Sequence, residues 1–199
     1  MPTLKISFVS VLWIAVLFCT HAPYLVPTLL AIALHEVGHI FLAHLLKIKI
    51  KCVHLSLLGA RLEAVGEISY KNELLLALGG PLFGILGFAF SIFPATKYDF
   101  EYLLYFSVIS LILALFNLLP LESLDGGRIL SCALCLRFNL ESAHKIMDCA
   151  CFLTLFVLWL FSVYIMLKIS SGLQTFVFCS FFFAKCFVFN KKNGDLTSF

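Results

Sequence analysis

A metal-binding motif lies inside an apolar segment that is long enough to cross a membrane. The segment covers about residues 24–46, and its later half reads His-Glu-Val-Gly-His at residues 35–39. About 20 apolar residues are enough for a helix to span the hydrocarbon core of a bilayer. Ionisable side chains at that depth are costly unless they are paired or bound to a metal. The chain must therefore fold so that a polar motif is satisfied within an apolar helix.

The spacing of the motif fits one metal ion. Residues four apart in a helix lie one turn above each other on the same face, so His35 and His39 can offer two imidazoles to one ion. Glu36 projects beside them, where it can take a proton from a water molecule rather than bind the metal. The alternative is a pair of helix-face histidines with a surface glutamate, which the apolar setting makes costly. We therefore expect a metal site with Glu36 as the catalytic base.

The composition predicts an all-α polytopic membrane protein, with residues 1–199 forming a single domain. Of its residues, 62% are hydrophobic and only 13% are charged, and the mean hydropathy is +1.05. No ordinary soluble domain has this balance. No basic run is interleaved with aromatic residues, so nucleic acid is not an expected partner. The apolar runs predict six transmembrane helices, at about residues 4–20, 24–46, 73–93, 102–119, 149–167 and 173–189.

The first apolar run has a competing interpretation as a cleaved signal peptide. The residues that follow it, Thr20, His21 and Ala22, make a poor small-residue cleavage site. We therefore expect it to be the first transmembrane helix.

Residues 47–70 differ in character from the apolar runs around them. Apolar and polar residues alternate with a period of two on both sides of Gly59, which predicts a short membrane-associated β-hairpin between the second and third transmembrane helices. A bare strand edge is intolerable in lipid, so the hairpin must lie on protein or line a wet cavity. Its edge would either bind an extended substrate by strand addition or serve only as a structural cover.

The distribution of basic residues predicts the orientation of the chain. With six spans, only Lys97 and Lys168 of the 14 Lys and Arg residues fall on one side of the membrane. Because cytoplasmic loops carry the excess of Lys and Arg, both termini are expected in the cytoplasm. The protein is thus expected to be a multi-pass protein of the cell membrane, with its metal motif about two to three turns from the cytoplasmic face.

This topology also predicts a third metal ligand. The second span runs toward the cytoplasm and the fourth ends there, so Asp125, which follows the fourth span, can reach the level of His35 and His39. Gly126 and Gly127 allow a tight turn at this point. Three protein ligands with one open position are typical of a catalytic zinc site. The alternative is a turn-forming aspartate, since Asp-Gly is a common turn dipeptide. We expect one Zn²⁺ per chain.

These two motifs resemble those of the site-2 protease family of intramembrane zinc metalloproteases, peptidase family M50. The first motif lies on the second of six spans, and the second reads Asn117-Leu-Leu-Pro, then Asp125-Gly-Gly, after the fourth span. The six-span plan is most similar to the sporulation-type branch, which processes the membrane-tethered precursor of sigma-K. The resemblance implies that His35, His39 and Asp125 bind zinc, that Glu36 is the catalytic base and that Asn117 contacts the substrate.

The resemblance also implies a partner and a location. The expected substrate is a membrane-spanning or membrane-tethered protein, cleaved near the cytoplasmic face in regulated intramembrane proteolysis. The expected surroundings are the lipid bilayer of a bacterial cell, by analogy with the family. A regulatory membrane partner is compatible with the family.

Gly79, Gly80 and Pro81 in the third span either break the helix or let backbones approach closely.

The chain departs from the family pattern at several points. The family often has Asn three residues after this Gly-Pro pair, where this chain has Gly84. A proline that is common near Ser123 in the sporulation branch is absent. We also expect neither a CBS domain after the last span nor a PDZ-like insertion.

Two other functions remain as alternatives. A catalytically silent scaffold or chaperone of the same family would be expected to lose the base or a ligand, whereas Glu36 is intact. A metal-ion transporter would need metal-binding groups on several spans that form a path across the membrane. Here the ionisable groups within the spans are concentrated around one helix, with no such path.

The cysteines leave a smaller question open. Of the eight cysteines, Cys132 and Cys135 form a C-x-x-C pair, and Cys149 and Cys151 lie nearby. They would serve either a second metal or redox site or helix packing. No second C-x-x-C pair accompanies them at finger-like spacing, which favours packing.

Overall fold

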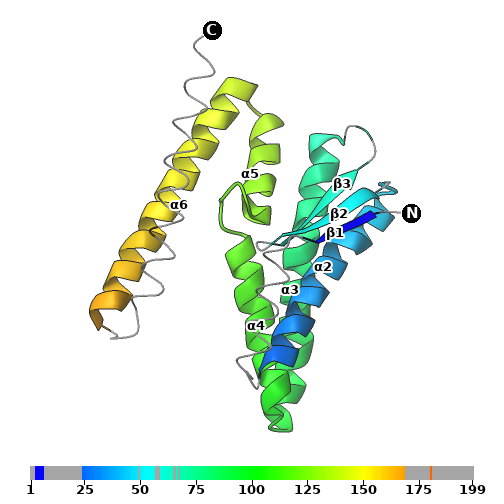
Figure 1. Ribbon diagram of the computed structural model, residues 1–199, viewed down its shortest axis with the longest axis vertical. Helices are drawn as coiled ribbons and strands as arrows, with labels where there is room; N and C mark the ends of the chain where they lie inside the picture. The colour runs from blue at the N-terminus through cyan, green and yellow to red at the C-terminus, as the bar shows by residue number, and fades with distance from the viewer. Residues whose placement is uncertain are drawn as a thin grey trace. The chain divides into compact units, whose positions relative to one another are not determined.

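The computed structural model describes residues 3–6, 24–48, 50–56, 59–64, 66, 68–168 and 180 of the chain. The chain divides into two compact units, Met1–Ala143 and His144–Phe199, and the candidate site lies in the first. In chain order, the described elements are β1 (Thr3–Ile6), α2 (Leu25–Leu45), β2 (Ile50–Ser56), β3 (Gly59–Ala64), α3 (Tyr70–Lys97), α4 (Glu101–Asn117), α5 (Asp125–Cys135) and α6 (Leu140–Lys168) (Figure 1).

The described part of the chain is mostly helical, and three of its helices are long and apolar enough to cross a membrane. These are α2, α3 and α6, which correspond to the second, third and fifth predicted spans. The helix α4 is also apolar but has only 17 residues, and it corresponds to the fourth predicted span. The predicted sixth span, residues 173–189, lies outside the described residues apart from Ser180. The six-span plan therefore stays a prediction.

The structure corrects the end of the third predicted span and the start of the first. The third span was expected to end at about residue 93, but α3 continues through Pro94 to Lys97 and ends just before Asp99, which adopts a positive φ of 54°. Residues 4–6 were expected to begin the first transmembrane helix, but they belong to the strand β1. Their sequence, Leu-Lys-Ile, alternates with a period of two, which is the pattern of a strand. The rest of that predicted span, residues 7–20, lies outside the described residues.

The strands form one three-stranded sheet in the order β1-β2-β3. The strands β2 and β3 pair antiparallel, with Ser56 opposite Gly59, and β1 pairs parallel to β2, with Thr3 opposite Cys52. The association of this sheet with a membrane stays a prediction.

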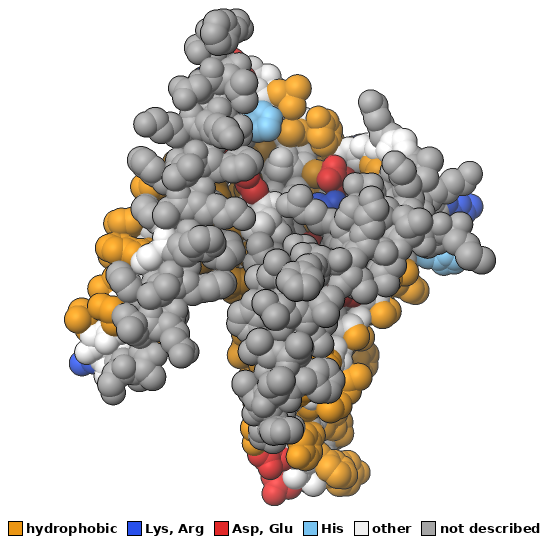
Figure 2. Space-filling view, viewed as in Figure 1, with side chains coloured by type: hydrophobic (Ala, Val, Ile, Leu, Met, Phe, Trp, Pro, Cys, Tyr) orange, Lys and Arg blue, Asp and Glu red, His pale blue; other side chains and the backbone are white. Residues whose placement is uncertain are grey.

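Small residues line the helix contacts of the first unit, whereas large apolar side chains face outward. Ala31, Ala77 and Ala114 are buried, as are Ser107 and Ser110. Exposed apolar side chains cover the outer surface of α2 and α3, among them Val26, Leu30, Leu82, Phe90 and Phe93. Figure 2 shows hydrophobic side chains gathered over this part of the first unit. Packing on small residues with large apolar groups outside is the arrangement of helices that are solvated by lipid.

Glycines bring α2 and α3 together backbone to backbone. A Cβ atom on Gly38 would clash with the carbonyl oxygen of Gly79, and one on Gly79 would lie 2.6 Å from the carbonyl oxygen of Gly38. Further along α3, a Cβ on Gly84 would lie 2.9 Å from the Cβ of Ala114 on α4. The helix α3 is not broken at Gly80 and Pro81. Close approach, rather than helix breaking, is thus the role of this glycine-rich segment.

In the second unit, α6 continues to Lys168 with aromatic residues along one side. The rings of Phe152 and Phe156 stack at a centroid separation of 6.3 Å, and Phe156 stacks on Trp159 at 6.5 Å. The indole nitrogen of Trp159 donates a hydrogen bond to the hydroxyl of Ser180 over 3.2 Å.

Candidate metal centre

The helix α2 places two histidines one turn apart on the face that packs against α3. His35 and His39 are each only 5% exposed. Their Nε2 atoms lie 3.3 Å apart and therefore converge on one point. The four-residue spacing of the motif produces this geometry, because residues i and i+4 share a helix face.

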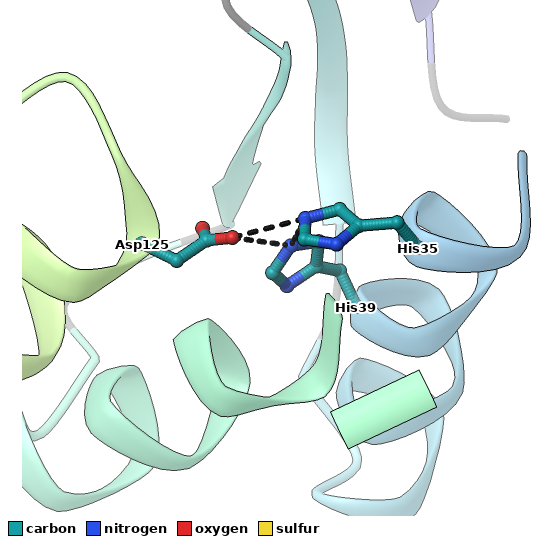
Figure 3. A group of neighbouring side chains, drawn as sticks. All are labelled: His35, His39 and Asp125. Atoms are coloured by element: carbon teal, nitrogen blue, oxygen red, sulfur yellow. Dashed lines mark hydrogen bonds and ion pairs between the residues drawn. The ribbon is translucent and has the colours of Figure 1, made fainter. Parts of the chain in front are cut away.

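A carboxylate from a distant part of the chain meets both histidines. Asp125 is the first residue of α5, and its Oδ2 atom lies 3.0 Å from the Nε2 of His35 and 3.2 Å from the Nε2 of His39. Figure 3 shows the carboxylate approaching the two imidazoles from the side opposite α2. One ligand atom from each of these residues lies within 4.8 Å of the others. The structure thus brings together the three residues that the sequence singled out as ligands.

Two glycines allow α5 to begin at this position. A Cβ atom on Gly126 would lie 2.5 Å from the carbonyl oxygen of Leu119, and one on Gly127 would lie 2.9 Å from the backbone nitrogen of Glu122. The first turn of α5 therefore packs directly on the backbone of the segment that follows α4. Side chains at these two positions would push Asp125 away from the histidines.

The helix α3 contributes a main-chain contact that orients His39. The Nδ1 atom of His39 lies 2.9 Å from the carbonyl oxygen of Leu76, which can only accept a hydrogen bond, so Nδ1 carries the hydrogen. The amide of Gly80 lies 3.3 Å from the same nitrogen and would need its lone pair, so we assign the shorter contact. In a metal-bound state, this contact of Nδ1 would leave the lone pair of Nε2 aimed at the centre, as metal-binding histidines require.

The helix α3 also passes close to the ligand atoms at Gly80, where a side chain would crowd them. A Cβ atom on Gly80 would lie 2.6 Å from the Cε1 of His35 and closer still to the Nε2 atoms of both histidines. Glycine keeps this space open in front of the ligand atoms. Two imidazole nitrogens and one carboxylate oxygen form a donor set that Zn²⁺ accepts in catalytic sites. The residues that are present therefore fit a zinc ion.

Electrostatics keep Asp125 ionised. Burial alone would raise the pKa of this carboxyl group, but hydrogen bonds with His35 and His39 outweigh burial and lower the pKa to about 2. The side chain of Asp125 is 12% exposed. Asp125 is thus a carboxylate at neutral pH, which is the form that binds metal ions.

The other residues singled out by the sequence lie around this cluster. Glu36 is partly buried on α2, directly after His35. Asn117 is the last residue of α4, and its side-chain amide donates a hydrogen bond to the carbonyl oxygen of Leu113 over 3.0 Å, one turn back on the same helix. His44 is exposed in the last turn of α2, away from the cluster.

The C-x-x-C pair is part of the packing of α5. Cys132 is buried, Cys135 is partly buried, and neither forms a disulfide. Burial, together with the nearby carboxylate of Glu73, raises the pKa of the Cys132 thiol to about 11. Such a thiol stays protonated at neutral pH and is a poor nucleophile and metal ligand.

Sequence reasoning missed what α3 contributes to the centre. The carbonyl of Leu76 belongs to the main chain, and Gly80 contributes by having no side chain. No side-chain pattern in the sequence therefore indicates either feature. The available signal was the run Gly79-Gly80-Pro81, which indicates a close backbone approach without naming the partner. An ion pair between Glu73 and Arg128 was also missed.

Comparison with known proteins gives consistent results. Residues 63–161 match the model of peptidase family M50. The chain is 31% identical over 121 residues to zinc metalloprotease MJ0392 of Methanocaldococcus jannaschii, a match that covers 58% of this chain and 35% of that protein. It is 32% identical over 180 residues to stage IV sporulation protein FB of Bacillus subtilis, covering 84% of this chain and 61% of that protein. The chain thus spans about a third of the first relative and three fifths of the second.

A solved structure shares the fold. The site-2 protease from Methanocaldococcus jannaschii superposes with a TM-score of 0.67 at 20% sequence identity. The match covers 92% of this chain and 88% of that one. At this identity the likeness concerns the fold alone.

Proposed function

Because this chain belongs to peptidase family M50, the family of the site-2 proteases, we propose that it is an intramembrane zinc metalloprotease. In this proposal it hydrolyses a peptide bond in a membrane-spanning or membrane-tethered protein, near the cytoplasmic face. The observation that carries the proposal is the convergence of His35, His39 and Asp125 in front of the open space at Gly80.

We assign a separate role to each residue of the centre. His35 and His39 would hold one zinc ion through Nε2, and Asp125 would hold it through a carboxylate oxygen. Bound there, zinc would supply a Lewis acid for peptide hydrolysis. Glu36 is the general base, which takes a proton from the attacking water and returns it to the leaving amine. The burial of both histidines and the contact of His39 with Leu76 support these roles, since ligands held in this way keep their geometry.

The proposal places this centre in a six-span membrane protein with both termini in the cytoplasm. Three apolar helices in the described part of the chain and the membrane-protease relatives support a membrane protein. His39 lies six residues before the end of α2, a rise of about 9 Å. Water therefore has a short path from the cytoplasmic side to Glu36. We take both compact units to belong to one transmembrane protease domain.

A helical substrate must unwind before cleavage, since its peptide bonds are hidden in hydrogen bonds along the helix. The sheet of β1, β2 and β3 offers strand pairing to an extended segment, which would hold it open near the centre. Asn117, at the end of α4, would contact the substrate. The hydrogen bond between its side chain and Leu113 would then be exchanged for one to the substrate.

The first test measures zinc in the protein purified in mild detergent without chelator. We expect about one zinc ion per chain, and its loss in His35→Ala and in Asp125→Ala, because each removes one of three ligands. His44→Ala, on the same helix but away from the cluster, is the matched control and should keep its zinc. Full zinc retention in Asp125→Ala would refute the assignment of the third ligand.

The second test separates a protease from a silent scaffold. The protein is incubated in liposomes with a panel of single-span peptides that carry central helix-breaking residues. Glu36→Gln should keep its zinc but lose cleavage by about 100-fold or more, because general-base catalysis contributes at least this much. Cleavage that persists in Glu36→Gln would contradict the assigned base. Zinc binding without cleavage in any peptide, together with a biological activity that survives Glu36→Gln, would favour the scaffold.

A further inference from the structure

The helices α3 and α5 pack so that one face of each carries groups that belong to the centre or lie beside it. On α3, Glu73, Leu76 and Gly80 follow at intervals of three and four residues, which places them on one face. On α5, Asp125, Arg128 and Cys132 follow the same spacing. At one end of this contact lies the candidate metal centre. An ion pair lies about two turns from Gly80 along α3 and less than one turn from Asp125 along α5.

The ion pair joins the two helices directly. The Nη2 atom of Arg128 lies 3.4 Å from Oε1 of Glu73, and the two side chains are only 26% and 35% exposed. The buried thiol of Cys132, one turn further along α5, lies near the same carboxylate, whose charge helps to raise the pKa of that thiol. An ion pair that is partly withdrawn from water is screened less than one on the open surface. Glu73 therefore anchors α5 to α3 through Arg128.

The helix α5 needs such an anchor more than an ordinary helix does. Among the described residues, no side chain caps its N-terminus, because Leu124 occupies the N-cap position. The next residues after Asp125 are glycines, which let α5 approach the preceding segment but offer no side chain that could hold it laterally. Arg128 is the first residue after these glycines, and its side chain contacts the neighbouring helix α3.

We propose that Glu73 and Arg128 are positioning residues that hold Asp125 at the distance from the two histidines required for zinc binding. This inference rests on the proposed zinc site. The pair links the helix that carries the third ligand to the helix whose Leu76 carbonyl orients His39. It therefore sets the separation between the two halves of the donor set, although neither residue touches the metal.

The expected effect is a loss of zinc affinity with little change in fold. Residues that orient metal ligands typically change metal affinity by about 10–100-fold when they are replaced. Arg128→Gln and Glu73→Gln should each weaken zinc binding within this range. The charge-swapped double variant, Glu73→Arg with Arg128→Glu, should recover much of the affinity because the pair can form again in reverse. Arg128→Lys should lie between the native protein and Arg128→Gln.

The experiment measures the zinc dissociation constant by competition with a chromophoric chelator, for the full chain in detergent. The visible absorption of the Co²⁺-loaded protein is recorded as a second measurement, because it reports the number and geometry of the ligands. Arg137→Gln, an exposed arginine just after α5, is the matched control and should bind zinc as the native protein does. Thermal unfolding of each metal-free variant shows whether the fold survives.

The outcomes separate this inference from the proposed function. If the native protein binds no zinc at this site, the proposed function fails, and the inference fails with it. If the native protein binds zinc and both Gln variants bind it equally well, with the same Co²⁺ spectrum, the positioning role alone is overturned. If a Gln variant does not fold, Arg128→Lys and the charge-swapped variant decide. Unchanged affinity in the first or no recovery in the second would overturn the inference.

Discussion

At Gly80, the metal centre requires a residue without a side chain. Gly80 faces the Nε2 atoms of both histidines, and the volume that its missing Cβ would fill is the volume in front of the ligand atoms. A methyl group there would compete directly with an ion. The requirement for glycine at this position is therefore chemical as well as steric, although Gly80 has no group that could bind metal.

We predict that Gly80→Ala abolishes zinc binding and leaves the protein folded. The new methyl group meets imidazole rings, which can rotate away, rather than a fixed backbone. Zinc affinity should fall by more than about 100-fold, beyond the effect of replacing a residue that only orients a ligand. Zinc content and the thermal unfolding of the metal-free protein are the two measurements.

Gly87→Ala is the matched control for this prediction. It makes the same change two turns further along α3, where the new Cβ would meet the Cδ2 atom of Leu34, the movable end of a flexible side chain. Zinc binding should be unchanged in this variant. A Gly80→Ala protein that binds zinc as tightly as Gly87→Ala would show that the ion lies elsewhere.

Between elements, the contact that matters most is the crossing of α2 and α3 at Gly38 and Gly79. Glycine in the middle of a helix costs about 0.5–1 kcal/mol relative to alanine. The chain nevertheless has glycine on both sides of the crossing, and the two backbones touch there. Because His39 directly follows Gly38, this crossing also brings its Nδ1 atom within reach of the Leu76 carbonyl.

We predict that Gly38→Ala destabilises the metal-free protein, in contrast to Gly80→Ala. Helix propensity alone would make the substitution stabilising. The new Cβ would instead press on the backbone of Gly79, which cannot move without separating the helices. Overpacking of this kind costs about 1–3 kcal/mol, so the midpoint of thermal unfolding should fall. A midpoint at or above that of the native protein would show that the helices do not meet at these glycines.

How much of this centre can be predicted from the sequence depends on the same crossing of α2 and α3. The spacing of His35 and His39 is local helix geometry, and the reach of Asp125 follows from a count of spans, so the structure brings these three together as expected. The contributions of Leu76 and Gly80 depend on where two helices cross and at what angle. No local pattern determines a crossing, so the sequence indicated only that some close approach involves the glycines of α3.

At the scale of the whole molecule, the described part of the chain exposes many large apolar side chains and buries many small ones, as proteins solvated by lipid do. Small residues such as Ala77 and Ser110 are inside, and large ones such as Phe90 and Phe93 are outside. Composition and hydropathy predict this arrangement well. They predict helix ends less well, as the continuation of α3 through Pro94 and the strand at residues 3–6 show. With small residues inside, a metal ion that links α2 to α5 should contribute measurably to the free energy of unfolding.

We predict that zinc stabilises the folded protein and that this effect requires the three ligands. A ligand that binds only the folded state stabilises it by about 2.7 kcal/mol when its free concentration is about 100 times the dissociation constant. Removal of zinc with a chelator should lower the unfolding temperature, and added zinc should restore it. In His35→Ala, neither treatment should have an effect. An unfolding temperature that responds to zinc equally in both proteins would mean that the metal stabilises through another site.

The contact between His39 and the carbonyl of Leu76 has a consequence for mutational scanning of this protein. A carbonyl oxygen belongs to every amino acid, so conservative replacement of Leu76 by Met or Ile would leave the contact in place. A scan would then score position 76 as a tolerant core position and positions 79 and 80 as intolerant. Substitution would not reveal the atom that orients this proposed zinc ligand. Its importance would be detected only at the neighbouring glycines that hold the two backbones together.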